Sequence, residues 1–369
     1  MAYTSLDFIV NRNNLRDCRY VEQPLDTQPG DVVLAVDRFA LTANNITYAA
    51  VGDAMGYWSF FPAEPGWGRI PVWGFADVIE SQHDNIAVGE RVYGYLPMSS
   101  HLQVRPARVT ARGFFDGAAH RAERAPAYNQ YTRLAADPAH DPAREATRML
   151  LQPLFLTSFI LDDFITEFCA SADNPSGARA VVLSSASSKT SLGLAFLLHA
   201  NRAGNVRVIG LTSPANRAFV EKVGYYDTVV TYDALHTLDR DTPVVFVDMA
   251  GNGGVLRAVH EHFDAALRYS CLVGATHWEA RGGAGRDTLR GPAPELFFAP
   301  TVLQKRTKEW GREGFDSRVA SAWGAFVPAA QRWLKVVSES GPLHVETIYE
   351  QVLAGRAPPD TGYVLSLKR

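Results

Sequence analysis

Five apolar runs alternate with helix-like segments in the second half of this 369-residue chain, and this alternation constrains the fold more than any other feature. The runs are ARAVVL, VRVIGLTS, YDTVVTYD, TPVVFVDMAG and LRYSCLVG. A strand that is apolar along its whole length is buried on both faces, so the pattern predicts a parallel sheet covered by helices on both sides. Sheets of this kind bind ligands beyond the carboxyl ends of their strands.

The rest of the chain has a different character. Residues 1–110 read as short strands separated by turns, as in DVVLAVDRFAL and GERVYGYLPMSSHLQV. Residues 111–150 are rich in Ala, Arg, Asp and Pro and predict an excursion with a short helix. The C-terminal GYVLSLKR predicts a final strand. A β-rich domain therefore precedes the predicted parallel sheet, and a closing strand follows it.

Composition and charge exclude several classes of protein. The formal net charge of −3 gives no electrostatic reason to bind nucleic acid or an anionic membrane. We expect no signal peptide and no membrane span, because no apolar run approaches roughly 20 residues. The odd number and wide spacing of Cys18, Cys169 and Cys271 argue against a disulfide framework and a structural zinc site. We therefore expect a cytoplasmic protein with no nucleic-acid or membrane partner.

This order of elements and several local patterns resemble the medium-chain dehydrogenase/reductase superfamily. The patterns are ANNITY followed by Gly52, IPVWGFADVIE followed by VGERVYGY, SSASSKTSLGLAFLL, VVFVDMAGN and LVGAT. The resemblance implies an α/β fold, with a GroES-like β-rich domain and a Rossmann-type doubly wound parallel sheet. It assigns residues 1–154 and 301–369 to the GroES-like substrate and catalytic domain, with an insertion at about 111–150, and residues 155–300 to the Rossmann dinucleotide-binding domain. It also implies a homodimer.

Two loops depart from the zinc-dependent members of that superfamily. Those members take their catalytic ligands from a Cys and from a Gly-His-Glu motif. The corresponding positions here hold Asn44 and Asn45 in the first loop, and Gly74, Phe75 and Ala76 in the second. Phe and Ala cannot coordinate a metal. The sequence therefore predicts a metal-free enzyme, similar to the quinone and enoyl reductase branches.

A serine–lysine turn stands where nucleotide-binding folds usually place glycines that let the backbone touch phosphate. It comprises Ser187, Ser188, Lys189 and Thr190, directly before an apolar helix. The helix start offers unpaired N–H groups, the hydroxyls add donors, and Lys189 adds positive charge. We therefore expect this turn to bind the pyrophosphate of a dinucleotide. The alternative is that Ser187 or Ser188 only caps the helix and that Lys189 is solvated.

The second predicted strand of the sheet ends in GLTSPANR, and this segment bears on the choice of cofactor. NAD sites commonly place Asp or Glu there to bind the ribose hydroxyls, whereas hydroxyl groups and an arginine suit a 2′-phosphate. We therefore expect Thr212, Ser213, Asn216 and Arg217 to bind NADPH in preference to NADH. The alternative is that Arg217 belongs to a solvated helix face.

The resemblance implies further contacts with the cofactor. Val273, Gly274 and Ala275 end the strand beside which relatives hold the nicotinamide, and Gly274 would allow close approach of its ring. Ala250 follows the fourth strand. Phe298 lies in ELFFAP, which resembles a second segment on the cofactor side. The alternative for the two phenylalanines of ELFFAP is the protein core.

Reduction of a conjugated C=C or C=O also needs a proton donor or a group that polarises the oxygen. Tyr48 is the first candidate donor, since it falls in the stretch that resembles the superfamily's first active-site loop. Tyr57 is the second candidate donor, and Asn45 is the candidate for polarising a carbonyl. The alternative for either tyrosine is a packed ring with a satisfied hydroxyl.

The most aromatic stretch of the chain is GYWSFFPAEPGWGRIPVWGF. It predicts a wall for an apolar or aromatic carbonyl substrate, and a dimer contact or local core are its alternatives. The sequence thus predicts an NADPH-dependent, metal-free oxidoreductase that transfers hydride to an activated double bond, quinone or ketone. Two alternatives stay open: a non-catalytic NADP(H)-binding sensor or accessory protein, and a reductase of acyl chains bound to a carrier or to CoA.

Overall fold

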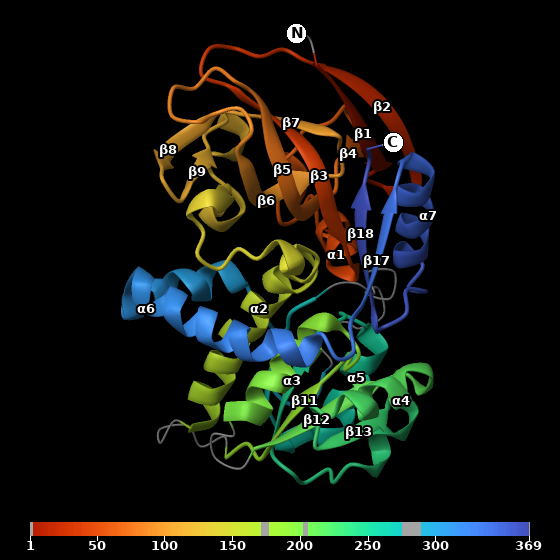
Figure 1. Ribbon diagram of the computed structural model, residues 1–369. Coiled ribbons are helices and arrows are strands. Elements are labelled where there is room, and N and C mark those ends of the chain that lie inside the picture. The colour runs from red at the N-terminus through yellow and green to blue at the C-terminus, as the bar shows by residue number, and fades with distance from the viewer. Residues whose placement is uncertain (1–2, 171–176, 202–205, 275–288, 369) are drawn as a thin grey trace. The chain divides into compact units, whose positions relative to one another are not determined.

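The computed structural model describes residues 3–170, 177–201, 206–274 and 289–368 (Figure 1). The chain forms two compact units. Unit 1 comprises Met1–Leu150 and Lys335–Arg369, and unit 2 comprises Leu151–Leu334.

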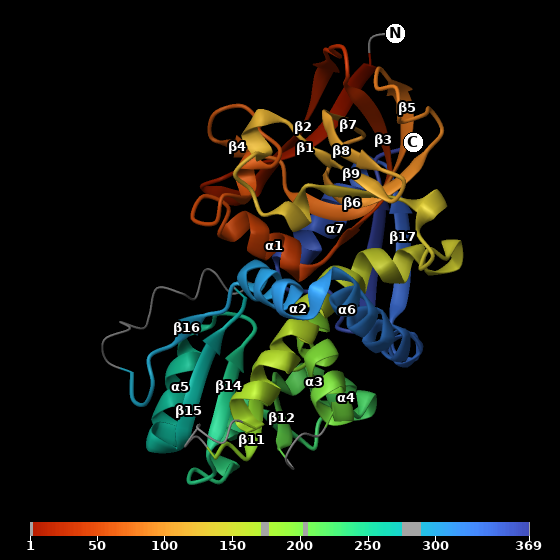
Figure 2. The same cartoon turned by 90° about the vertical axis from the view of Figure 1, so that its left-hand side faces the viewer.

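Unit 1 is built mainly from β-strands (Figures 1 and 2). Its strands are β1 (Tyr3–Asn11), β2 (Asn14–Leu25), β3 (Val32–Leu41), β4 (Trp67–Gly68), β5 (Pro71–Ser81), β6 (Arg91–Pro97), β7 (His101–Val104), β8 (Pro106–Thr110), β9 (Gly113–Asp116), β10 (Gln130–Arg133), β17 (Lys335–Ser340) and β18 (Thr361–Ser366). Its helices are α1 (Ala43–Ala50) and α7 (Pro342–Leu353), and its 3-10 turns are η1 (Tyr57–Ser59), η2 (Ala119–Arg121), η3 (Pro126–Tyr128), η4 (Leu134–Ala136) and η5 (Pro142–Arg144). A three-stranded sheet has the order β2-β1-β4, and a nine-stranded sheet has the order β17-β18-β3-β5-β6-β10-β9-β8, with β7 paired to β3.

The nine-stranded sheet joins the C-terminal strands to strands from the first half of the chain. The C-terminal β18 pairs antiparallel with β3, where Val364 faces Ala40, so the final strand predicted from the sequence is present. Residues 111–150 were expected to leave the sheet, but β10 pairs with β6 through Thr132 and Tyr93 and continues through β9 to β8. The helical parts of this segment are the 3-10 turns η2 to η5 and the first residues of a long helix that begins at Glu145. The reason is hydrogen bonding, because this segment supplies the backbone partners of β6.

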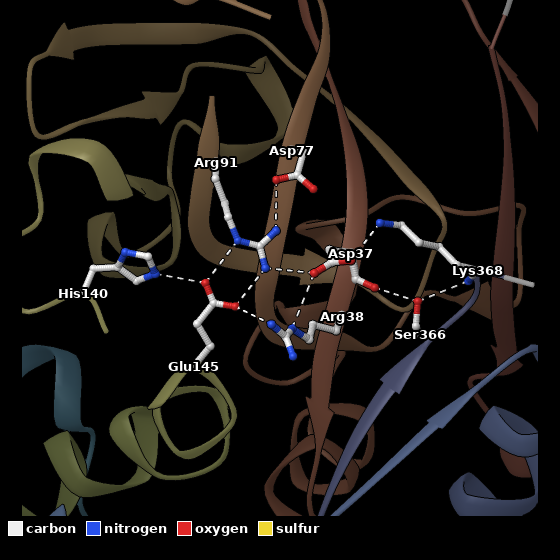
Figure 3. A network of polar contacts seen from close by, with 8 residues as sticks. All are labelled: Asp37, Arg38, Asp77, Arg91, His140, Glu145, Ser366 and Lys368. Atoms are coloured by element: carbon white, nitrogen blue, oxygen red, sulfur yellow. Dashed lines mark hydrogen bonds and ion pairs between the residues drawn. The ribbon is translucent and has the colours of Figure 1, made fainter. Parts of the chain in front are cut away.

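A buried carboxylate lies where the chain leaves these strands (Figure 3). Glu145 is only 3% exposed and begins helix α2 (Glu145–Ala170). Its oxygens accept hydrogen bonds from Arg38 of β3 at 2.7 Å and from Arg91 of β6 at 2.8 and 3.1 Å. Nε2 of His140 lies 3.0 Å from the same carboxylate. Three segments that are far apart in sequence therefore meet at one charge.

The guanidinium of Arg91 binds two further carboxylates in the same network (Figure 3). It donates to Asp77 at 2.9 Å and to Asp37 at 2.8 Å. Asp37 also accepts from Lys368, near the C-terminus, at 2.7 Å. Burial by itself would raise the pKa of Asp37, but the hydrogen bonds from Lys368 and Arg91 lower it. The network therefore ties the C-terminal residues to the same strands that hold Glu145.

Unit 2 contains a parallel sheet covered by helices. Its strands are β11 (Ala180–Leu183), β12 (Arg207–Thr212), β13 (Thr228–Thr231), β14 (Val244–Asp248), β15 (Leu267–Leu272) and β16 (Glu295–Leu296). Its helices are most of α2, α3 (Lys189–Asn201), α4 (Pro214–Val223), α5 (Gly253–Phe263) and α6 (Ala299–Ala330), with 3-10 turns η7 (Tyr232–Thr237) and η8 (Asp264–Ala266). The strand order β13-β12-β11-β14-β15-β16, parallel at every pairing, is the doubly wound order, and it confirms the predicted Rossmann-type fold.

Alternate residues of the central strands pack on opposite faces of this sheet. Val181 and Leu183 of β11 join the core that includes Ile160 and Leu161 of α2. Ala180 and Val182 of the same strand join the core beneath α5. The strand is apolar throughout because both of its faces are buried, as the sequence pattern indicated.

Residues 301–334 lie in unit 2 and not in the β-rich domain to which the sequence assigned them. They form most of α6, whose Phe326 stacks on Phe155 of α2 with ring centroids 4.8 Å apart. Arg306 of α6 pairs with Asp163 of α2 at 2.5 Å. The segment belongs to unit 2 because its apolar and charged side chains find their partners on α2.

Helix α2 corrects the expectation that no segment is long and apolar enough to span a membrane. The helical stretch Pro142–Cys169 passes that test by length and composition alone. However, more than half of its most apolar window is buried, and Leu161 and Ile165 are at most 1% exposed. These side chains pack against the Rossmann sheet, as in the core helix of a soluble protein.

We predict that Glu145→Gln lowers the free energy of unfolding by about 2–3 kcal/mol at neutral pH, because breaking a buried ion pair leaves charged partners without compensation. Urea denaturation measures this loss. Asp77→Asn is the matched control on the same guanidinium, and the Asp77 side chain is 37% exposed. We expect this control to lose less than about 1 kcal/mol. Equal losses from the two variants would contradict the role given to the buried carboxylate.

The same pair of variants predicts a pH dependence. Burial would raise the pKa of Glu145, but hydrogen bonds from Arg91 and His140 and the charge of Arg38 lower it below its ordinary value. A lowered folded pKa stabilises the protein fully above the unfolded value of about 4.3, and this stability is lost as the pH falls through the folded pKa. Glu145→Gln should therefore lose less stability than the parent chain between neutral pH and about pH 3.

Candidate functional site

The turn between β11 and α3 is held by side chains where related folds use glycines. Ser185 has a φ of +47°, in the left-handed region that is costly for a residue other than glycine. Oγ of Ser188 accepts a hydrogen bond from the N–H of Ser191 at 3.2 Å, so Ser188 caps the helix. The first helical residues, Lys189 and Thr190, have N–H groups with no acceptor inside the helix. The capping alternative therefore holds for Ser188 and leaves the positive helix end facing the turn.

Two tyrosines pack against this turn. The Tyr232 hydroxyl accepts from the N–H of Ser185 at 3.0 Å, and the Tyr226 hydroxyl donates to the carbonyl of Ala186 at 2.8 Å. A Cβ on Gly210 would lie 2.8 Å from the Cβ of Ala186, so the adjacent strand passes too closely for any larger residue. The N–H of Ser185 is thus used within the protein. Any contact with phosphate would therefore have to come from the start of α3 and from side chains.

The end of β12 lies against the same turn. Nδ2 of Asn216 donates to Oγ of Ser187 at 3.0 Å, which joins the two segments predicted to bind the cofactor. Ser213 precedes α4 and makes no capping hydrogen bond with its side chain. Thr212, the last residue of β12, is 1% exposed, and its buried Oγ1 makes no hydrogen bond with the described residues.

Arg217 lies on the exposed side of α4. Its Nε donates to Glu221 at 2.7 Å, one helical turn further along, and both side chains are about half exposed. The end of β12 itself has no carboxylate in the sequence, but Glu221 stands further along, on α4. Any 2′-phosphate that binds Arg217 therefore competes with Glu221.

The turn after β14 is organised by a buried aspartate. Oδ1 of Asp248 accepts from Oγ of Ser184 at 2.8 Å and from the N–H groups of Ala250 and Gly251, each at 3.1 Å. Ala250 is 2% exposed. Its N–H is used by Asp248 within the protein.

The end of β15 holds the residues expected near the nicotinamide. Val273 is partly buried, and its N–H donates to the carbonyl of Asp248 at 2.9 Å. A Cβ on Gly274 would lie 1.9 Å from the carbonyl oxygen of Met249, so the glycine is required by the protein itself before any ring is considered. Ala275 lies outside the described residues. Phe298 is 38% exposed, while its neighbour Phe297 is in the core.

The candidate proton donors of unit 1 belong to a cluster of aromatic rings. The ring centroids of Tyr48 and Tyr57 lie 4.5 Å apart. Tyr128, from η3, lies 6.4 Å from Tyr48 and 6.0 Å from Tyr57, and 4.8 Å from Tyr95 of β6. The structure thus brings both predicted tyrosines together and adds Tyr128 to them.

Several polar atoms of this cluster are buried without a hydrogen-bond partner among the described residues. They are Nε1 of Trp73 and the hydroxyls of Tyr93 and Tyr95. Burial raises the pKa of Tyr48, and the nearby phenol of Tyr57 raises it further. Burial likewise raises the pKa of Tyr57. Both phenols therefore stay protonated at neutral pH, and their chemistry is that of donors.

Asn45 has a structural task that its predicted role does not account for. Its Oδ1 accepts from the N–H of Thr42 at 2.8 Å and from the hydroxyl of the same residue at 3.1 Å. Its Nδ2 donates to the carbonyl of Pro71 at 2.8 Å, and the residue is 3% exposed. The amide closes the capping box of α1 and joins it to β5. This geometry does not support a role in polarising a substrate carbonyl.

A fully buried arginine holds Tyr128 in place. Arg121 is 0% exposed and donates to Asp116 at 2.8 Å, to the Tyr131 hydroxyl at 3.0 Å and to the carbonyl of Tyr128 at 2.8 Å. Its guanidinium lies 5.0 Å from the ring centroid of Phe61. The segment 127–131 (AYNQY) is therefore attached to the aromatic stretch through the buried charge of Arg121.

The aromatic stretch predicted to wall a substrate pocket is divided in the structure. Trp58 and Phe61 are 3% and 2% exposed and belong to the core. Trp67 lies under the guanidinium of Arg19, 4.1 Å from its ring centroid. Phe60 packs edge-on against Tyr95 at 5.3 Å and joins the tyrosine cluster. Core packing therefore accounts for part of the stretch.

Sequence reasoning missed the residues that position the others. Tyr232 directly follows β13, and its place at the carboxyl edge of the sheet was a usable signal, whereas Tyr226 lies between α4 and the start of β13 and gave none. The sequence gave no signal for Arg121 and Asp116. Arg121 is one of many arginines in this segment, and nothing in the local pattern distinguishes a buried one from an exposed one. Within the residues that the structure describes, no group of three or more His, Cys, Asp or Glu side chains could hold a metal ion.

Solved structures share this fold at low sequence identity. CurA from Vibrio vulnificus in complex with NADPH has a TM-score of 0.63 at 12% identity, over 99% of both chains. The YhdH oxidoreductase from Salmonella enterica in complex with NADP has a TM-score of 0.53 at 16% identity, over 100% of both chains. The quinone oxidoreductase from Coxiella burnetii has a TM-score of 0.54 at 13% identity, over 99% of this chain and 100% of that one. The GroES-like and Rossmann-type fold class expected from the sequence is therefore confirmed.

No match was found among curated proteins. A family model described as "Protein of unknown function (DUF2855)" matches residues 39–358, which is most of the chain. The chain therefore belongs to the DUF2855 family.

Proposed function

We propose that the protein is an NADPH-dependent oxidoreductase that transfers hydride to an activated double bond, quinone or ketone. One observation carries this proposal. The hydrogen bond between Asn216 and Ser187 joins the first turn of α4, which follows β12, to the turn before α3, so that a helix N-terminus, serine hydroxyls and Arg217 share one edge of a Rossmann sheet. That edge is where dinucleotides bind in this fold.

Further observations support the phosphorylated cofactor. The end of β12 carries Ser213 and Arg217, and no Asp or Glu stands there to bind the ribose hydroxyls of NAD. Ser187, Ser188, Lys189 and Thr190 offer hydroxyl, ammonium and N–H donors for a pyrophosphate. Two of the solved structures that share the fold hold NADPH or NADP, which supports the same cofactor here.

The bound nicotinamide would supply the hydride. The protein's own groups would bind the cofactor, orient the substrate and protonate it. The backbone at Ala250, Val273 and Gly274 and the exposed ring of Phe298 are the proposed surroundings of the nicotinamide, together with Ala275. Tyr48 is the proposed proton donor, with Tyr57 as the second choice. Both phenols carry a proton to donate at neutral pH, although burial raises their pKa and so makes them weaker acids than an exposed tyrosine. No protein metal ligand enters this scheme.

One observation favours a second candidate, a non-catalytic NADP(H)-binding sensor or accessory protein. The N–H of Ser185 donates its hydrogen bond to the Tyr232 hydroxyl, whereas in a glycine-rich turn the corresponding N–H is available to phosphate. NADPH binding without turnover of free enones, quinones, ketones and acyl-CoA thioesters would favour that candidate. Turnover of the thioesters alone would select the acyl-chain reductase instead. A homodimer in the cytoplasm remains part of the proposal.

Lys189→Ala should weaken binding of NADPH and NADH alike, by about tenfold, because the pyrophosphate common to both loses one charged partner. Titration of cofactor fluorescence measures both dissociation constants. Lys308→Ala, at an exposed position of α6, is the charge-matched control and should leave both unchanged. Unaltered constants for Lys189→Ala would remove the turn from the phosphate site.

Arg217 and Glu221 allow a paired test of cofactor preference. Arg217→Ala should weaken the binding of NADPH by about tenfold and leave the binding of NADH almost unchanged, since only NADPH carries the 2′-phosphate. Glu221→Gln should act in the opposite direction, because it removes the carboxylate that competes for the guanidinium. The same titrations measure both effects. Equal losses for the two cofactors in Arg217→Ala would show that this arginine does not meet the 2′-phosphate.

Tyr48→Phe should lower kcat by about 100-fold if its phenol is the proton donor, with little change in the dissociation constant of NADPH. Oxidation of NADPH with a panel of quinones and enones measures kcat. Tyr57→Phe is the matched control in the same cluster and should lose less than about tenfold. A Tyr48→Phe variant with full kcat would transfer the role to another group or to water.

A further inference from the structure

Unit 1 contains a cavity of about 450 Å³ that none of the predicted site residues lines. This volume is in the range of small-molecule sites. One wall is a face of the β1–β2 pair, where Asp7 is opposite Val21 and Ser5 is opposite Gln23. Another wall is β7, where His101 and Gln103 alternate with more deeply buried residues. The cavity is therefore bounded by strands whose register fixes the positions of its side chains.

The carboxylates of this cavity already have partners. Asp7 accepts from Ser5 at 2.6 Å and from Arg69 at 3.1 Å. Asp31 accepts from the Nε atom of Arg105 at 3.0 Å and from Gln103 at 2.6 Å. These carboxylates are at most 3% exposed. They shape the wall, and each is already paired with an arginine, so its charge is compensated within the protein.

The third carboxylate that lines the cavity, Glu64, is paired with Arg19. The carboxylates of the wall are thus paired within the protein. Two donor groups remain for a ligand.

Arg105 is the first of these donors. Asp31 engages only its Nε, and among the described residues neither of its Nη atoms makes a hydrogen bond. The Nη edge of a guanidinium has two parallel N–H groups that match the two oxygens of a carboxylate. The side chain is 58% exposed, so this edge is accessible from the cavity mouth.

His101 is the second donor. Oγ of Ser100 accepts from the N–H of Leu6 at 2.8 Å and lies 2.9 Å from Nδ1 of His101. In the tautomer in which this hydroxyl donates to Nδ1, the ring carries its hydrogen on Nε2. Burial lowers the pKa of His101, so the ring is neutral at pH 7. Its Nε2–H makes no hydrogen bond with any described residue.

We propose that this cavity binds a small amphipathic carboxylic acid. Its carboxylate would lie on the Nη edge of Arg105, and its chain would lie on Ile9, Val21, Leu25 and Val104, which line the same cavity. His101 precedes Arg105 by four residues on an extended strand, which separates their Cα atoms by about 13 Å. A chain of about six to ten carbons spans that distance, and Nε2–H of His101 would bind an oxygen near its far end.

Calorimetric titration of the full chain with 6-hydroxyhexanoate, 10-hydroxydecanoate and 6-hydroxyhexanamide tests this proposal. The acids should bind saturably with a Kd of about 1 mM or tighter, and the uncharged amide at least about tenfold more weakly. Arg105→Gln should weaken the binding of the ten-carbon acid by at least about fivefold. Arg112→Gln, at an exposed arginine outside the cavity, is the matched control and should leave it unchanged.

Arg105→Lys is a further variant. It keeps the positive charge beside Asp31 but removes the Nη edge of the guanidinium, so it should also weaken the binding of the ten-carbon acid. Thermal unfolding of each variant verifies that it is folded, and the NADPH dissociation constant should not change in any of them. Absence of saturable binding by both acids would overturn the proposal. Equal affinity for acid and amide, or full affinity in folded Arg105→Gln, would overturn it as well.

Discussion

The buried carboxylate of Glu145 is the interaction on which unit 1 depends. A carboxylate that is 3% exposed is stable only if its lost hydration is replaced, and here two arginines and a histidine replace it. These partners come from β3, from β6 and from the segment before α2, so the charge can be satisfied only when all three are in place. The same arginine of β6 reaches Asp37 and, through it, the C-terminal lysine.

In unit 2 the comparable constraint is the turn after β11. A glycine-free turn needs its unusual backbone to be held from outside, and Tyr232 and Tyr226 do this by binding the N–H of Ser185 and the carbonyl of Ala186. The consequence is chemical as well as structural. An N–H that holds a tyrosine is not available to phosphate, so the proposed site depends on side chains and on the first turn of α3. This makes lysine, serine and arginine side chains the natural targets for experiments.

The proposed catalytic groups show how far residue patterns reach. Tyr48 and Tyr57 were selected by their place in the sequence, and the structure brings their rings within 4.5 Å. Asn45 was selected on the same basis, but its amide is used to hold α1 on β5. Tyr128 and Arg121 were not selected, because their importance comes from a strand pairing that carries residues 113–133 back to β6. A side chain's neighbours across a sheet cannot be read from local spacing.

By itself, the sequence determined the fold class, the parallel sheet, the closing C-terminal strand and the position of the serine–lysine turn. Hydrophobic periodicity and turn residues are local properties, and they specify local structure directly. Only the tertiary structure decided that residues 301–334 pack with α2, that Thr212 is buried, that Arg217 is paired with Glu221 and that Arg121 is fully enclosed. These outcomes depend on which distant segments meet, and desolvation and hydrogen bonding act only after they have met.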